Sequence, residues 1–344
     1  MIVVVIPSLQ SGGTEWQTYF LLKALLSRHR ICLWVYDRRN ADQPLYKQFA
    51  ALSGLQIVSG IGLRQIFSLV RLRPRIILSY AINYYLPEIL LAGLTRAVLV
   101  TERRNQYHWL KHQKRRKIQE NLRNLMTRAV ICNSRAVADK VAQMERFVSG
   151  KLHVIYNSIN PFGADPAAPK NALVVACNIK PGKGVEQILK IFESLEPLAA
   201  ESGVEFAVYG RLDDPSLLQG RDRALIERVY KGEATREEIF ANAFCLVHLS
   251  EAEGFPNAVL EAASADMALV LSGIPVHREI FAGAALFVDD YPQALEAVRQ
   301  MIVWCAAAPD KLFEQSENSR RLAAGFTLNR RVAAYEKLFD ACRD

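Results

Sequence analysis

Short apolar runs alternate with amphipathic stretches along the whole chain. The runs predict buried strands, and between them apolar residues recur at helical spacing, as at Trp16, Phe20 and Leu25. The expected strands lie at residues 2–6, 31–36, 55–58, 76–80, 98–101, 129–132, 153–156, 172–176, 204–209, 243–249 and 268–272. Such alternation predicts doubly wound parallel sheets, whose ligands bind beyond the carboxyl ends of the strands. The expected fold class is therefore α/β.

Length and charge both indicate two domains. The chain has 344 residues and 51% hydrophobic composition, which is enough for two cores. A proline-rich stretch at 161–169 predicts the linker. Residues 1–160 carry 24 Lys and Arg against 8 Asp and Glu, whereas residues 161–344 carry 19 against 27. The charge changes sign where the linker predicts the domain boundary.

The apolar runs and the cysteine positions indicate where the protein is located and whether its cysteines form disulfides. The best candidate for a membrane span, residues 86–100, contains Glu88 and Arg96. The apolar start lacks the basic region and cleavage site of a signal peptide, so we expect a cytoplasmic protein. Six cysteines are scattered singly, which predicts buried free thiols and no metal site.

Residues 250–263 carry the most chemical information. Gly254 and Pro256 interrupt the chain between an apolar strand and a helix, and Asn257 is a good N-cap. The first amides of that helix, those of Asn257, Ala258 and Val259, are then expected to face an anion. Glu253 and Glu261 bracket these amides and could bind hydroxyl groups. A nucleotide sugar offers both the anion and the hydroxyl groups. The alternative is an ordinary capped helix with a solvated face, which explains the same spacing.

The segment E-G-F-P-N at 253–257, followed by Glu261-Ala262, resembles the E-x7-E motif of glycosyltransferase family 4. This family comprises retaining enzymes with two Rossmann-like domains that face each other across a cleft, the GT-B fold. The resemblance implies that Glu261 binds the ribose and that Glu253, Phe255, Pro256 and Asn257 orient the sugar. It implies no cofactor and no metal. It also implies an acceptor-binding domain at 1–160, a nucleotide-sugar domain at 161–327, and a terminal helix at about 328–344 that packs back on the first domain.

Two further loops resemble donor-binding loops of the family. Gly12 and Gly13 follow the first strand; they do not form the dinucleotide fingerprint but resemble the G-G-x-E loop, which implies contact with the donor pyrophosphate or the acceptor. A plain tight turn is the alternative. Gly210 and Arg211 stand where the family has a turn near the nucleotide.

Lys180 and Lys183 lie in a glycine loop at a predicted helix start, where they could neutralise a diphosphate. The loop resembles the family's Arg and Lys-Gly pattern, with Asn178 or Lys180 in place of the arginine. Lysine provides a point charge without the bidentate fork of arginine. We assign Lys183, Lys180 and Glu253 as the catalytic candidates, against the alternative of incidental surface lysines.

Residues 103–117 contain seven Lys and Arg and no acid, with aromatic residues among them. The interpretation is a surface for the acceptor or for an anionic membrane, against the alternative of a solvated helix face. The residues assigned to it are Glu102, Arg103, Arg104, His108, Lys111 and Arg115. No nucleic-acid-binding motif is present, so we expect no nucleic acid partner.

The segment T-E-R-R-N at 101–105 resembles the S-E-R-N type of family members that build bacterial glycans on lipid carriers, with Glu102 and Arg103 where many members have a histidine. The resemblance implies transfer of a hexose or N-acetylhexosamine, with UDP favoured, to a glycan or polyprenyl-diphosphate-linked acceptor. Such an acceptor leads us to expect a peripheral location on the inner face of the membrane. The alternatives are a sugar-nucleotide epimerase of the GT-B type and a non-catalytic, membrane-associated transferase subunit.

Overall fold

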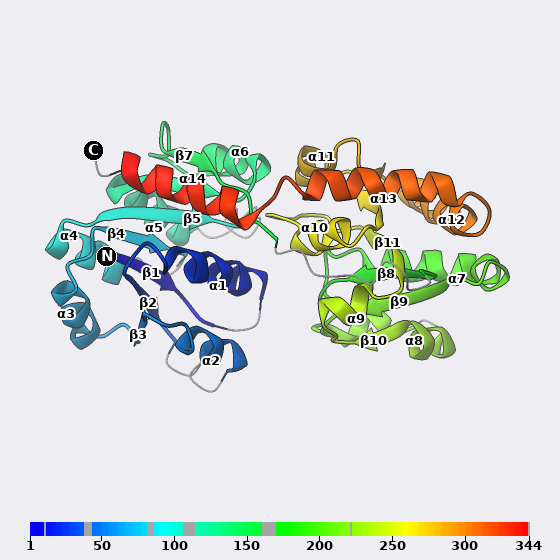
Figure 1. The fold of residues 1–344 in the computed structure, drawn as a ribbon, viewed down its shortest axis with the longest axis horizontal. Coiled ribbons are helices and arrows are strands. Elements are labelled where there is room, and N and C mark those ends of the chain that lie inside the picture. The colour runs from blue at the N-terminus through cyan, green and yellow to red at the C-terminus, as the bar shows by residue number, and fades with distance from the viewer. Residues whose placement is uncertain are drawn as a thin grey trace. The chain divides into compact units, whose positions relative to one another are not determined.

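The computed structural model describes residues 1–9, 12–37, 43–80, 86–105, 114–159, 170–220 and 222–342. The chain forms two compact units (Figure 1). Unit 1 contains Met1–Ser158 and Thr327–Asp344, and unit 2 contains Ile159–Phe326. Each unit is built on a parallel sheet with helices on its faces, which confirms the predicted α/β class.

The sheet of unit 1 has the order β3-β2-β1-β4-β5-β6-β7. Its strands are β1 (Ile2–Ile6), β2 (Ile31–Val35), β3 (Leu55–Ser59), β4 (Ile76–Ser79), β5 (Val98–Arg103), β6 (Thr127–Cys132) and β7 (Leu152–Val154). All pairings are parallel, and the strand order reverses between β1 and β4. That switch point is where open α/β sheets bind ligands.

Alternate residues of the unit 1 strands enter two cores. Ile2 and Val4 of β1 pack with helices on one face of the sheet, while Val3 and Val5 pack on the other. The helices are α1 (Gly13–Leu25), α2 (Pro44–Ala50), α3 (Leu63–Arg71), α4 (Leu86–Thr95), α5 (Lys114–Met126), α6 (Arg135–Met144) and α14 (Leu328–Ala341).

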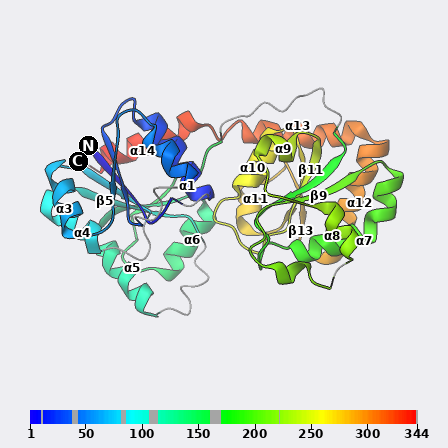
Figure 2. The same ribbon diagram turned by 90° about the horizontal axis from the view of Figure 1, so that it is seen from below.

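Helix α14, at the end of the chain, packs beside α1 (Figure 2). Tyr335 and Phe339 are buried in the same core as Leu21 and Leu22 of α1. Arg331 Nη1 donates to the Gln17 carbonyl and to its side-chain oxygen, at 2.9 and 2.6 Å. Thus the last residues of the chain complete the core of unit 1.

The sheet of unit 2 has the order β10-β9-β8-β11-β12-β13. Its strands are β8 (Ala172–Ala176), β9 (Glu205–Tyr209), β10 (Tyr230–Gly232), β11 (Ala243–His248), β12 (Ala268–Ser272) and β13 (Leu286–Val288). Its helices are α7 (Val185–Glu201), α8 (Arg223–Val229), α9 (Arg236–Phe240), α10 (Asn257–Ser264), α11 (Pro275–Phe281), α12 (Tyr291–Ala307) and α13 (Pro309–Ala323). The order reverses between β8 and β11, so the loops after these two strands lie at the switch point.

Two predictions on chain chemistry can be compared with the structure. All six cysteines are free thiols; four are buried, and Cys177 and Cys305 are partly exposed. In the described parts of the chain, no helix combines the length and apolar character needed to cross a bilayer.

Candidate functional site

The polar cluster of unit 2 lies at the carboxyl ends of its strands. His248 ends β11 and Ser272 ends β12, while the loop at 177–184 leaves β8. The Glu251 amide donates to the Gly182 carbonyl at 2.9 Å, so the loops after β8 and β11 are tied together. This is the sheet edge at which the sequence predicts a ligand.

Glu253 is the centre of this cluster. Its Oε1 atom lies 2.5 Å from Lys183 Nζ and 3.0 Å from His248 Nε2. Burial alone would raise the pKa of Glu253, but the His248 hydrogen bond and the Lys183 ammonium together hold that pKa well below its usual range. The carboxylate is therefore ionised near neutral pH, and Lys183 is the cation that faces it.

Two buried histidines belong to the cluster, and the sequence analysis missed both. Because an ionised carboxylate can only accept, His248 Nε2 donates to Glu253; the Ser250 hydroxyl lies 3.0 Å from the same nitrogen. His277 Nδ1 donates to the Ser272 carbonyl at 2.9 Å. Burial, followed by the charge of His248, lowers the pKa of His277 to about 3, so this ring is neutral.

A single histidine at the end of an apolar strand carries little signal in a sequence. The position of His248, five residues before Glu253 of the E-G-F-P-N segment, is a hint that could have identified it.

The loop that carries Lys183 requires its glycines. Gly184 has φ +70°, and a Cβ there would lie 2.3 Å from the Leu249 carbonyl oxygen. This close approach brings the start of α7 against the loop after β11, and Lys183 with it. Lys180 is exposed on the same loop, and no contact of it with Glu253 is observed. The structure thus brings Lys183, but not Lys180, to Glu253.

Helix α10 begins one residue earlier than the sequence predicts. Pro256 occupies the N-cap position with φ −85°, and Asn257 is the first helical residue. The prediction of Asn257 as N-cap is wrong, because its amide donates to the Phe255 carbonyl at 3.0 Å and no side chain caps the helix. Ala258 and Val259 follow as helix-start residues, whose amides have no acceptor within the helix.

Glu261 lies about one turn into α10. Its environment is the opposite of that around Glu253. The side chain is 25% exposed, and Arg236 Nη1 lies 3.6 Å from its Oε1 atom. Burial raises the pKa of Glu261 to about 7, with Arg236 opposing the shift. Within one segment, the pKa of Glu253 is therefore lowered and that of Glu261 is raised. Such opposite shifts often mark functional groups.

Gly210 and Arg211 follow β9 at the same edge of the sheet. Gly210 has φ +139°, and a Cβ there would lie 1.9 Å from the Cys177 carbonyl oxygen, so only glycine fits this turn. The exposed Arg211 side chain donates to Asp213 at 2.6 Å. A role of Arg211 in donor binding stays a prediction.

In unit 1, the predicted glycine loop leads into α1. Gly12 is the N-cap residue of α1, which begins at Gly13. Arg104 Nη1 donates to the Thr14 carbonyl at 3.0 Å, and Arg104 Nε donates to Glu102 at 2.6 Å. Tyr335 of α14 donates to the other oxygen of Glu102 at 2.7 Å. Glu102 and Arg104 thus join the end of β5 to α1 and α14 at the switch point of this sheet.

The predicted exposed surface at Arg103 is wrong. Arg103 is only 1% exposed, and its guanidinium donates to Glu145 and to Glu120 at 3.0 Å. Successive strand residues point to opposite faces of a sheet, so Arg103 points away from Glu102 and Arg104 into a buried ionic network. Glu102 and Arg104 are buried as well. Arg115 is exposed on α5, whereas His108 and Lys111 lie outside the described residues.

Two family models match this chain. A model described as Glycosyltransferase Family 4 matches residues 11–161, and one described as Glycosyl transferases group 1 matches residues 170–303. The chain belongs to the glycosyltransferase family 4 type. The family 4 match lies almost wholly in unit 1 and the group 1 match lies in unit 2, so each unit is matched by a glycosyltransferase model.

One known protein and two solved structures illustrate what this family 4 protein is similar to. It is 28% identical over 167 residues to the O-antigen chain mannosyltransferase RfbU of Salmonella typhimurium, a match that spans 46% of either protein. The solved structure of Anabaena Alr3699/HepE in complex with UDP and glucose matches with a TM-score of 0.81 at 14% identity, over 98% of this chain and 99% of that one. A glycosyltransferase from Rickettsia africae matches with a TM-score of 0.78 at 16% identity, over 99% and 98%. The likeness to these structures shows the GT-B fold.

Proposed function

We propose that this family 4 protein transfers a hexosyl or N-acetylhexosaminyl group from a nucleotide diphosphate sugar to a glycan or polyprenyl-diphosphate-linked acceptor. The single observation that carries the proposal is the pair of Glu253 and Lys183 at the switch point of unit 2. It places an ionised carboxylate beside a cation at the start of α10, where a sugar and a diphosphate need such groups.

The proposed donor is a UDP-sugar, held by unit 2. Glu261 would accept hydrogen bonds from the ribose, while Glu253, Phe255, Pro256 and Asn257 would hold the sugar. The complexes of Anabaena HepE with UDP and with UDP-glucose support this choice of donor. The name of the Salmonella relative, an O-antigen mannosyltransferase, supports a place in glycan or surface polysaccharide biosynthesis.

In the proposed reaction, the bond between the anomeric carbon and the diphosphate oxygen breaks, and its electron pair goes to the diphosphate. The acceptor oxygen forms the new bond, and its proton goes to the leaving diphosphate. Lys183, Lys180 and the amides of Ala258 and Val259 would stabilise the negative charge that grows on the leaving diphosphate. We infer retention of the anomeric configuration from the family resemblance.

The proposed acceptor site is in unit 1. Gly12 and Gly13 at the start of α1, and the buried pair of Glu102 and Arg104 beside them, form the polar edge of that sheet. A polyprenyl-linked acceptor would require work at a membrane, so we propose a cytoplasmic protein that associates with the inner face of the membrane.

The test is UDP release and product formation by the purified full chain with UDP-sugars and lipid-linked or glycan acceptors. Glu253→Gln and Lys183→Ala should cut turnover with the fold intact, whereas Lys190→Ala on the exposed side of α7 should not. Wild-type rates from both site variants would contradict the proposal. Conversion of the donor without acceptor would indicate the epimerase, and no turnover with any donor would indicate the non-catalytic subunit. The anomeric configuration of the product, read by NMR, decides retention.

A further inference from the structure

Helix α5 of unit 1 exposes its apolar face and buries its polar face, which is the reverse of an ordinary surface helix. Its apolar residues Ile118, Leu122, Leu125 and Met126 recur at the spacing of one helical face, yet each is 53% to 58% exposed. The opposite face carries Glu120, Arg123 and Asn124, which are buried. An amphipathic helix normally buries its apolar face, so the exposed stripe is suited to an apolar environment outside the protein.

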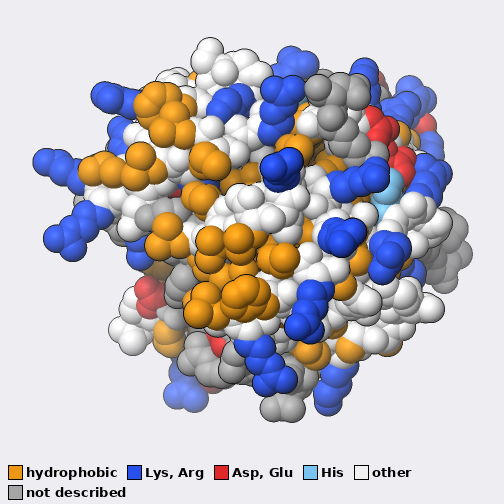
Figure 3. Space-filling model, turned by 90° about the vertical axis from the view of Figure 1, so that its left-hand side faces the viewer, with side chains coloured by type: hydrophobic (Ala, Val, Ile, Leu, Met, Phe, Trp, Pro, Cys, Tyr) orange, Lys and Arg blue, Asp and Glu red, His pale blue; other side chains and the backbone are white. Residues whose placement is uncertain are grey.

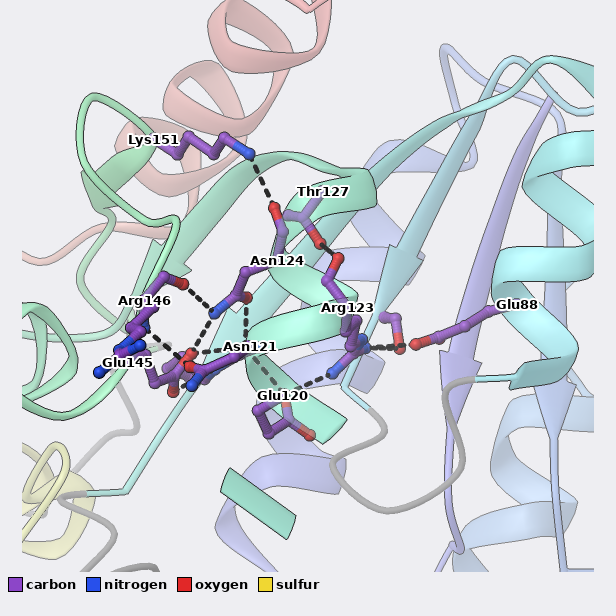
Figure 4. A network of polar contacts seen from close by, with 11 residues as sticks. Glu88, Glu120, Asn121, Arg123, Asn124, Thr127, Glu145, Arg146 and Lys151 are labelled. Carbon is purple, nitrogen blue, oxygen red and sulfur yellow. Dashed lines mark hydrogen bonds and ion pairs between the residues drawn. The ribbon is translucent and has the colours of Figure 1, made fainter. Parts of the chain in front are cut away.

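Buried ion pairs keep the polar face of α5 directed into the protein (Figure 4). Arg123 Nη2 lies 2.5 Å from Glu88 of α4, and Glu120 binds Arg103 of β5 at 3.0 Å. Removing Arg123 would leave Glu88 buried without its cation, and removing Arg103 would leave Glu120 and Glu145 without the cation that they share. The network fixes the polar face inward and therefore keeps the apolar stripe on the surface.

Neighbouring helices extend this apolar surface. Helix α4 also buries a charge, Glu88, and exposes Leu86, Leu90 and Leu94 at a spacing of four residues. Helix α3 packs beside α4 and exposes Leu63 and Phe67. Figure 3 shows hydrophobic side chains gathered on the end of unit 1 that bears α3 and α4. We call the exposed apolar residues of α3, α4 and α5 the α3–α4–α5 face.

The charge around the α3–α4–α5 face is positive. Between residues 43 and 138 the sequence has only three acids, Glu88, Glu102 and Glu120, and all three are buried. Exposed cations on the same helices and their ends include Arg64, Arg71, Arg96, Lys114, Arg115 and Lys117. Lys and Arg surround the hydrophobic side chains in Figure 3.

We propose that the α3–α4–α5 face docks on an anionic lipid bilayer, with its Leu, Ile, Phe and Met side chains at the acyl boundary and its cations on the headgroups. A bilayer takes up apolar side chains over a broad surface and supplies anionic groups around them. The exposed cations on and beside α3, α4 and α5, helices that expose no acid, complement such a membrane. The inference extends the proposed membrane association, and its test measures binding and not sugar transfer, so either proposal can fail alone.

The experiment is co-sedimentation of the full chain with vesicles of phosphatidylcholine alone and of phosphatidylcholine with phosphatidylglycerol. The wild type should bind the anionic vesicles, more weakly as salt rises. The double variant Leu122→Ser, Leu125→Ser should lose at least about tenfold in partitioning, because two apolar side chains no longer enter the boundary. Arg64→Gln with Arg96→Gln should also bind less, by about fivefold per charge.

The matched control is Phe313→Ser, which removes a residue on α13 of unit 2 that is 68% exposed and should leave binding unchanged. All substituted side chains are on the surface, and an unchanged melting temperature shows that the fold is kept. A wild type that ignores anionic vesicles, or a Leu122 and Leu125 variant that binds as well as the wild type, would overturn the proposal. So would a lipid-free dimer that this variant splits, because the face would then bind a second copy of the chain.

Discussion

Lys183 and Glu253 form an ion pair of 2.5 Å although they come from two separate loops of unit 2, 70 residues apart in the chain. The cation of the candidate site is thus paired with the carboxylate of the same site. The pair fixes two side chains from the loops that precede α7 and α10. A diphosphate would then meet a preorganised cation, and a sugar a preorganised acceptor.

The first prediction separates these two roles. Glu253→Gln should bind UDP at least as tightly as the wild type, because Lys183 is released from its carboxylate partner, while turnover falls. Lys183→Ala should weaken UDP binding by roughly 10- to 100-fold, the loss of one charge-assisted contact. Calorimetric titration of both variants measures this. Weaker UDP binding by Glu253→Gln than by the wild type would contradict the assigned roles.

The second prediction concerns His248 as a positioning residue. Its hydrogen bond is one of the causes that lower the pKa of Glu253. His248→Phe removes the donor, so the pKa of Glu253 should rise and the acid limb of the turnover profile should move to higher pH. A profile of kcat against pH measures the shift. A lower kcat with an unshifted acid limb would show that His248 does not act through the pKa of Glu253 and has only a structural role.

The third prediction uses the raised pKa of Glu261, about 7 in the folded chain against the model-peptide value of 4.5. Between pH 4.5 and 7 the folded state keeps a proton that the unfolded state releases, so stability from this group is lost as pH rises through that window. Glu261→Gln should therefore melt above the wild type at pH 8, with the difference vanishing toward pH 4.5.

Melting curves of Glu261→Gln, with Glu314→Gln on the exposed side of α13 as control, check this sign. A variant that melts below the wild type at pH 8 would show that the carboxylate is stabilised in the fold. The gain in stability should be accompanied by weaker UDP binding, since Glu261 is the proposed ribose ligand.

The fourth prediction concerns the buried ionic network of unit 1. Arg103→Met would leave Glu145 and Glu120 without their shared cation, which should lower the free energy of unfolding by about 3 to 5 kcal/mol. Arg115→Met, on the exposed side of α5, should change it by less than about 0.5 kcal/mol. Urea unfolding followed by fluorescence compares the two. Equal transitions would mean that the network contributes nothing to stability.

The strands and the loop and helix start that carry the E-x7-E motif could be predicted from sequence, because both depend on residues that are close in the chain. Continuous apolar runs identify buried parallel strands, and Gly254 and Pro256 correctly predict the loop between β11 and α10. The contact of Lys183 with Glu253 depends on Gly184 packing against Leu249, a tertiary approach that no spacing reveals.

Unit 1 shows why the remainder was not predictable. Arg103 lies between Glu102 and Arg104 in a polar run, and only the direction of β5 decides that it enters the buried network. The apolar stripe of α5 is visible in the sequence, but such a stripe ordinarily predicts the buried face. The reversal depends on partners from α4 and β5, which are distant in the chain.

The most direct test of the donor site is the melting temperature of the purified chain against UDP, GDP, ADP, dTDP and NAD, with and without magnesium. A ligand at about 100 times its dissociation constant adds about 2.7 kcal/mol, which is a visible shift. The account predicts that UDP raises the melting temperature of the wild type and that Glu261→Ala, measured against its own ligand-free curve, loses this shift. If no nucleotide diphosphate stabilises the wild type, or if Glu261→Ala responds as fully as the wild type, unit 2 does not bind the donor as proposed.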